Sequence, residues 1–167
     1  HAVDPARPSD WRCEQLWYFD AERLVGLLRL TAERDTEARA VDLSVRFADY
    51  DAVRGGAVTH CLRGEDGTYA AGPLRLRILS HTLARELVEP TWVCAYLRDR
   101  PGRGVYLRSA SADGRFRAGE QFELLAEVRP RGSAAADIVR LDEGFGFRLC
   151  TAQGSTVARL CDADGGG

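Results

Sequence analysis

The stretch QFELLAEVRP (residues 121–130) decides the fold class, because apolar and polar side chains alternate along it. The opposite face carries the acids Glu123 and Glu127, with the apolar Leu125 between them as the exception. A repeat of two residues is typical of a β-strand with one buried face. The stretch therefore predicts a strand packed against a core through its apolar side, which consists of Phe122, Leu124, Ala126 and Val128.

Strand patterns recur on both sides of this stretch. The same alternation is present in AVDLSVRF (40–47) and in PLRLRILS (73–80), and turn signals such as GEDG (64–67) separate the segments. Short strands spaced by turns predict an all-β fold, an antiparallel β-sandwich or a barrel-like sandwich. Further strand candidates are GAVTHCLR (56–63), TWVCAYLR (91–98), GVYLRSAS (104–111), DIVRL (137–141), FGFRLC (145–150) and STVARLC (155–161).

One segment favours a helix instead. SHTLARELVEP (80–90) begins with residues suited to cap a helix, spaces Leu83 and Leu87 four apart, and ends at Pro90. We therefore expect one or two short connector helices within the sandwich. The predicted domains are a flexible arm over 1–10, a single β-sandwich domain over 11–161 and a flexible tail over 162–167.

Composition narrows the chemistry. The 23 basic and 25 acidic residues are interspersed, so we expect no nucleic-acid partner, and no apolar run is long enough for membrane insertion. Every basic residue is an arginine, which excludes Schiff-base, pyridoxal and phosphate-loop lysine chemistry. Asparagine and methionine do not occur either, and this scarcity of residues with AT-rich codons indicates a GC-rich source.

The cysteines predict the compartment. None of the five lies in a Cys-x-x-Cys pair, and their wide spacing favours two disulfides in a secreted or extracellular protein. Buried free thiols are the alternative. Because the number is odd, one thiol stays free or bridges to another chain, which would give a disulfide-linked oligomer; a non-covalent oligomer is equally open. The disulfide candidates are Cys13, Cys61, Cys94, Cys150 and Cys161.

The stretch RDRPGRGVYLRS (98–109) combines four arginines with two glycines, so a phosphate-binding loop has to be considered. Pro101 and Gly102 form a common turn pair between two strand candidates. No helix pattern follows, so no helix dipole would face a phosphate. The stretch therefore predicts the turn of a β-hairpin.

The strands beside this hairpin carry the predicted ligand-binding surface. With Val93, Ala95 and Leu97 directed inward, aromatic and arginine side chains share the opposite face. Tryptophan, tyrosine and arginine are enriched in binding hot spots. Aromatic residues also crowd DWRCEQLWYFD (10–20), where core packing is the expected role. The predicted ligand-binding residues are Trp92, Tyr96, Arg98, Arg100, Arg103, Tyr106 and Arg108.

These patterns favour a non-catalytic binding module, secreted or part of an ectodomain, that recognises a protein ligand and uses no cofactor. A viral decoy that captures a host protein is one form of this function. The chain contains no G-x-S-x-G motif, so its pattern gives no support to nucleophilic catalysis. A disulfide-linked structural subunit is an alternative, because the odd cysteine could bridge two chains.

A second alternative comes from His1. In this terminal histidine and in its expected β-sandwich, the chain resembles the lytic polysaccharide monooxygenases. The resemblance implies a copper-dependent oxidase or a copper-binding protein in which His60 or His81 completes the site, because imidazole suits copper. A histidine left by a purification tag is the other explanation of this terminus.

Overall fold

The computed structural model describes residues 10–48, 61–63, 66–83, 85–93 and 101–160. These residues form fourteen strands and no helix, which confirms the predicted all-β class. Within the same ranges, no helix is therefore long and apolar enough to cross a membrane. The strands are β1 (Trp11–Phe19), β2 (Leu24–Ala32), β3 (Thr36–Glu37), β4 (Ala40–Ala48), β5 (Cys61–Arg63), β6 (Tyr69–Ala71), β7 (Leu74–His81), β8 (Arg85–Val93), β9 (Pro101–Ala110), β10 (Arg115–Phe116), β11 (Gln121–Pro130), β12 (Asp137–Arg140), β13 (Gly146–Thr151) and β14 (Gly154–Arg159).

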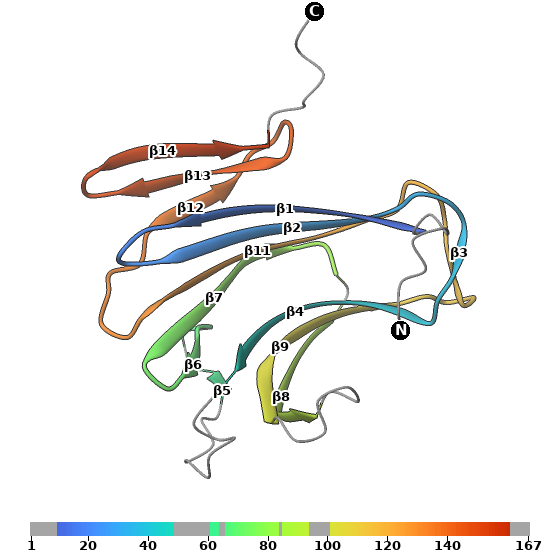
Figure 1. Ribbon diagram of the computed structural model, residues 1–167, viewed down its shortest axis with the longest axis horizontal. Coiled ribbons are helices and arrows are strands. Elements are labelled where there is room, and N and C mark those ends of the chain that lie inside the picture. Colours follow the sequence, from blue (N-terminus) through green and yellow to red (C-terminus); the bar gives the residue numbers. More distant parts are fainter. Residues whose placement is uncertain (1–9, 49–60, 64–65, 84, 94–100, 161–167) are drawn as a thin grey trace, which may run out of the picture.

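The strands pack as layers around a central sheet (Figure 1). That sheet has six antiparallel strands in the order β1-β2-β11-β7-β6-β5. A three-stranded sheet, β4-β9-β8, packs on one of its faces, and another, β12-β13-β14, packs on the other. The short pair β3–β10 makes the remaining sheet. The expected sandwich is therefore present, with an additional layer.

The interface between the central sheet and β4-β9-β8 is lined by hydrocarbon. Leu76, Leu124 and Leu107 are all fully buried there, and they come from β7, β11 and β9. Phe116 and Phe122 meet edge to face, with ring centroids 5.4 Å apart. We call this layer contact the apolar interface, because burial of apolar surface is its main source of stability.

The interface between the central sheet and β12-β13-β14 also contains a hydrophobic cluster. Leu125 and Leu27 from the central sheet meet Ile138, Phe147 and Leu149 from the outer sheet. This contact explains the exception in the alternating pattern of β11. Leu124 and Leu125 are both buried, because β11 lies in the middle layer and is covered on both faces.

The predicted helix over residues 80–90 is wrong, since this segment holds the end of β7 and most of β8. A helix of two turns is marginal by itself, whereas β8 pairs with β9 along most of its length. Pro90 does not stop the strand, because β8 is an edge strand and its register shifts between Glu89 and Trp92. Proline is tolerated at such edges and bulges, where no ladder hydrogen bond is needed.

The hairpin predicted around residues 98–109 is confirmed as an antiparallel pair, β8 with β9. Its turn is not at Pro101 and Gly102, because β9 begins at Pro101, which stands opposite Val93. The first position of a strand suits proline. The connecting residues 94–100 and the predicted tail over 162–167 lie outside the described residues, as does the predicted arm over 1–10 except for Asp10.

Candidate functional site

Three large apolar side chains are exposed together on the β1–β2 hairpin. Phe19 is 78% exposed, Trp17 is 48% exposed and Leu24 is 38% exposed. Phe19 stands opposite Leu24, and Trp17 stands two residues earlier on the same face of β1. We call these three residues the apolar strip. Tryptophan and phenylalanine left in contact with water on a flat sheet indicate a docking surface.

The indole of Trp17 is fixed in place by its neighbours. Gly26 is its cross-strand partner, and a Cβ atom on Gly26 would collide with the six-membered ring of the indole. The ring therefore lies across β2, in the space that the glycine leaves. Trp17 Nε1 also donates a hydrogen bond to Gln15 Oε1 at 3.1 Å. These contacts hold the indole of Trp17, which lowers the entropy cost of ordering that side chain on binding.

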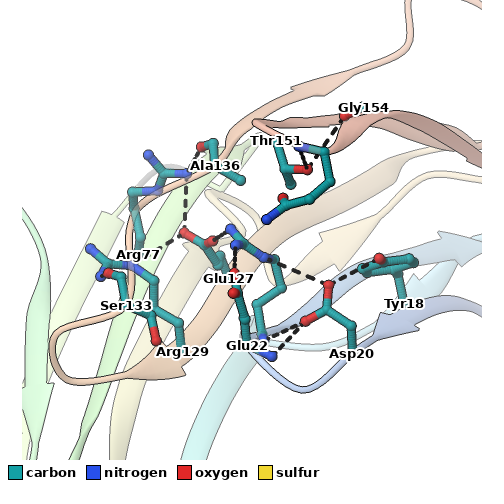
Figure 2. A network of polar contacts seen from close by, with 12 residues as sticks. Tyr18, Asp20, Glu22, Arg77, Glu127, Arg129, Ser133, Ala136, Thr151 and Gly154 are labelled. Carbon is teal, nitrogen blue, oxygen red and sulfur yellow. Dashed lines mark hydrogen bonds and ion pairs between the residues drawn. The ribbon is translucent and has the colours of Figure 1, made fainter.

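Beneath this hairpin, on the opposite face of the central sheet, lies a buried ionic network (Figure 2). Glu127 of β11 is fully buried, and Arg23 Nη1 donates to its Oε1 at 3.1 Å. Arg77 Nη2 lies 3.1 Å from Oε2 of the same carboxylate, and Arg129 Nε lies 3.7 Å from that oxygen. The network joins the β1–β2 turn to the centre of the sheet. Because these charges are paired in the protein interior, removal of one partner would leave the others uncompensated.

Asp20 fixes the turn that follows Phe19. Its Oδ1 accepts hydrogen bonds from the backbone N–H groups of Glu22 and Arg23 at 2.7 and 2.8 Å, and Tyr18 Oη donates to Oδ2 at 3.0 Å. Desolvation raises the pKa of Asp20, but these hydrogen bonds and the Arg23 charge outweigh it, so that the pKa is lowered. The hydrogen bond that Tyr18 Oη donates to Asp20 raises the pKa of Tyr18.

A groove of about 380 Å³ runs between this turn and the β13–β14 hairpin. Its lining includes the polar residues Tyr18, Asp20, Glu22, Thr151, Gln153 and Thr156 together with the apolar Ala21 and Leu149. Both oxygens of Asp20 already accept hydrogen bonds from the protein, and Glu22 Oε2 accepts one from Arg23 Nη2 at 2.8 Å. These carboxylates therefore stabilise the turn between β1 and β2.

Four of the seven predicted ligand-binding residues belong to strands β8 and β9: Trp92, Arg103, Tyr106 and Arg108. Arg108 is exposed, and its guanidinium donates to both carboxylate oxygens of Asp42 on β4, at 2.7 and 3.0 Å. Val105 and Leu107 of β9 are fully buried, so Arg108 stands on the outer face of this strand. Trp92, Arg103 and Tyr106 belong to β8 and β9, but their side chains are outside the described residues, as are Tyr96, Arg98 and Arg100 entirely.

The cysteines give no support to the predicted disulfides. Cys13 is exposed and Cys150 is half-buried, and both are free thiols. Cys150 Sγ lies 3.4 Å from the hydroxyl of Ser155. Two disulfides need four cysteines, whereas only three remain once these two are free. The side chain of Cys61 and all of Cys94 and Cys161 lie outside the described residues.

The copper prediction is not tested by the structure. His1 and His60 lie outside the described residues. His81 is half-buried at the end of β7, beside a second, open groove of about 550 Å³ that Asp66 and Ser80 also line. Among the residues that the structure describes, no group of three or more histidine, cysteine or acidic side chains could hold a metal ion.

Comparison with known proteins adds no relative. The chain matches no family model, no curated protein and no solved structure. The apolar strip was missed at the sequence level, where the aromatic residues of 10–20 were assigned to the core. The available signal was the alternation of β1, in which Trp17 and Phe19 share a face with Cys13 and Gln15. Trp11 stands on the same face but packs against the core, so this face changes from covered to exposed along the strand.

Proposed function

We propose that this protein is a non-catalytic binding module that recognises a protein ligand through the apolar strip. The observation that carries the proposal is the joint exposure of Trp17, Phe19 and Leu24 on one rigid hairpin. Scattered single apolar residues are normal on a protein surface, but adjacent aromatic residues with fixed geometry are typical of binding hot spots.

A protein ligand is favoured over a small molecule by the shape of the surface. The strip lies on the face of a sheet, and its residues line neither of the two grooves described above. Small ligands bind in concave sites that bury most of their surface, whereas flat apolar surfaces suit another protein.

The β8–β9 pair supplies a second surface in this proposal. Arg108 is exposed on β9, and its ion pair with Asp42 leaves the guanidinium accessible at the outer face of β4-β9-β8. Secretion and the capture of a host protein by a virally encoded decoy remain predictions of the same proposal.

The test compares proteins captured from extracellular fluid by the immobilised wild type and by Trp17→Ser/Phe19→Ser. We expect the double variant to lose a specific ligand by about tenfold or more, because truncated hot-spot residues carry most of the binding energy. Quantitative mass spectrometry of the retained proteins measures the loss.

The matched control is Val139→Ser/Val157→Ser on the outer sheet. These two valines are 48% and 54% exposed, so the control removes exposed apolar surface elsewhere. The control should retain the ligand. Equal capture by the wild type and by the variant of the apolar strip would refute the proposal.

A further inference from the structure

Strand β1 ends the central sheet, since the strand order starts with β1 and continues with β2. The backbone groups that face away from β2 can be identified from the two ends of the hairpin. Asp10 O accepts from Glu33 N at 2.9 Å, and Asp20 N donates to Arg23 O at 3.0 Å. Along β1, the residues bonded to β2 are therefore even-numbered, and those directed outward are odd-numbered, because the direction alternates. Cys13, Gln15 and Trp17 are among the outward residues.

Two long edges of the molecule are regular over nine residues, β1 and β4, whereas β8 and β5 are interrupted. The two regular edges differ in their exposed side chains, because β4 exposes Asp42, which is paired with Arg108, whereas β1 exposes Trp17 and Phe19. On β8, Pro90 lies in a register shift, and on the far side of the central sheet β5 has only three residues. Short length, proline and bulges are devices by which proteins prevent unwanted strand pairing. β1 has none of these devices in its nine residues, and its pairing with β2 runs without a shift.

One face of β1 is apolar near the C-terminal end of the strand, beside the edge where an added strand would pair. Trp17 and Phe19 stand on the face formed by the odd-numbered residues, whereas the charged Arg12 and Glu14 stand on the other face. A regular edge strand with exposed aromatic residues is a template for pairing with another strand.

From these observations we infer that β1 pairs antiparallel with β1 of a second copy of this chain, across a two-fold axis at Gln15. Gln15 is the midpoint of Trp11–Phe19, so this register pairs all nine residues of both strands. Its side-chain amide both donates and accepts hydrogen bonds, so it is complementary to its own copy. An axis at Glu14 would instead place two carboxylates opposite each other.

In this arrangement Trp17 lies opposite Cys13 of the second copy, so part of the apolar strip is covered by the dimer. The two central sheets then join into one continuous sheet. The inference rests on the proposed function, because it names the second copy as the protein that the strip binds. It also satisfies the outward backbone groups of β1, which a contact through side chains alone would leave in water.

The decisive experiment is a charge exchange at the axis. Sedimentation should give the wild type a mass twice the 18.4 kDa of one chain. Gln15→Lys and Gln15→Glu each place two like charges opposite each other, so each should weaken dimerisation by about tenfold or more. An equimolar mixture of the two variants should restore the dimer, because the opposed charges then attract. Arg148→Glu, on the middle strand β13 of the outer sheet, is the control and should leave the dimer unchanged.

A monomeric wild type at about 100 μM, well above the dissociation constant expected for a stable interface, would overturn the inference. If Gln15→Lys and Gln15→Glu each formed a dimer alone as strongly as in the mixture, the register with its axis at Gln15 would be wrong. A monomeric wild type whose capture of another protein still depends on Trp17 and Phe19 would overturn only the dimer and leave the proposed function standing. If substitution of Trp17 and Phe19 changed neither dimerisation nor the capture of another protein, both proposals would be refuted.

Discussion

The two layer contacts of the central sheet are held together differently. In the apolar interface, the fully buried residues Leu107 and Leu124 meet hydrocarbon from the facing sheet. On the other face, the two buried charged residues of the described chain, Arg23 and Glu127, lie beside the hydrophobic cluster. We call this second contact the charged interface. The same sheet therefore depends on apolar burial on one side and additionally on ion pairing on the other.

A second ion cluster joins the charged interface to the outer sheet. Glu123 of β11 accepts hydrogen bonds from Arg29 Nε of β2 at 2.6 Å and from Arg140 Nε of β12 at 3.0 Å. The Arg29 guanidinium also lies 4.6 Å from the ring centroid of Phe145. In addition to its hydrophobic cluster, the outer sheet is thus attached by ion pairs, which weaken when the carboxylates are protonated. The β4-β9-β8 sheet is attached by apolar contacts, which do not titrate.

The largest effect is expected from Glu127→Gln. This change keeps the shape of the side chain but leaves Arg23, Arg77 and Arg129 without their shared carboxylate. Removing one partner of a buried ionic network costs about 3–5 kcal/mol. Urea unfolding at pH 7 measures the loss, and a loss below about 1 kcal/mol would show that solvent enters the network and compensates the arginines.

A smaller or similar loss is expected from Leu107→Ala in the apolar interface. Truncating a fully buried leucine costs about 2–5 kcal/mol through lost transfer energy and the cavity left behind. The loss should be the same at pH 4 and pH 7, because no titrating group is involved. A loss that changed with pH would mean that the two interfaces are coupled through the central sheet.

The alternation in the sequence predicted most of the strands but not the number of layers. In β11 the predicted face, Leu124 and Ala126, belongs to the apolar interface, whereas Leu125 signals the second covered face. One unexplained leucine does not reveal which strands cover it. β12, β13 and β14 were each predicted as strands, but their packing on β11 depends on contacts distant in sequence.

The helix over 80–90 and the position of the site could not be predicted for related reasons. The spacing of Leu83 and Leu87 fits a helix locally, and only the ladder with β9 makes this segment a strand. Trp17 and Phe19 could equally be core residues from sequence alone. Their exposure depends on how far the β4-β9-β8 layer extends along β1, since Trp11 on the same face packs against the apolar interface, and local patterns carry no information about that extent.

The smallest effect concerns Glu123 and sharpens the comparison through pH. Desolvation raises the pKa of this carboxyl, but hydrogen bonds and charges from Arg140 and Arg29 outweigh it, so the pKa is lowered from the ordinary 4.5. A lowered pKa in the folded state means that Glu123 stabilises the protein above about pH 4.5 and loses this contribution as the pH falls toward its folded value. The stability gap between the wild type and Glu123→Gln should therefore narrow from pH 7 to pH 3. The difference in stability between the wild type and Leu107→Ala serves as the control and should not change with pH. If the difference for Glu123→Gln also did not change, titration of Glu123 would not contribute to the stability of the charged interface.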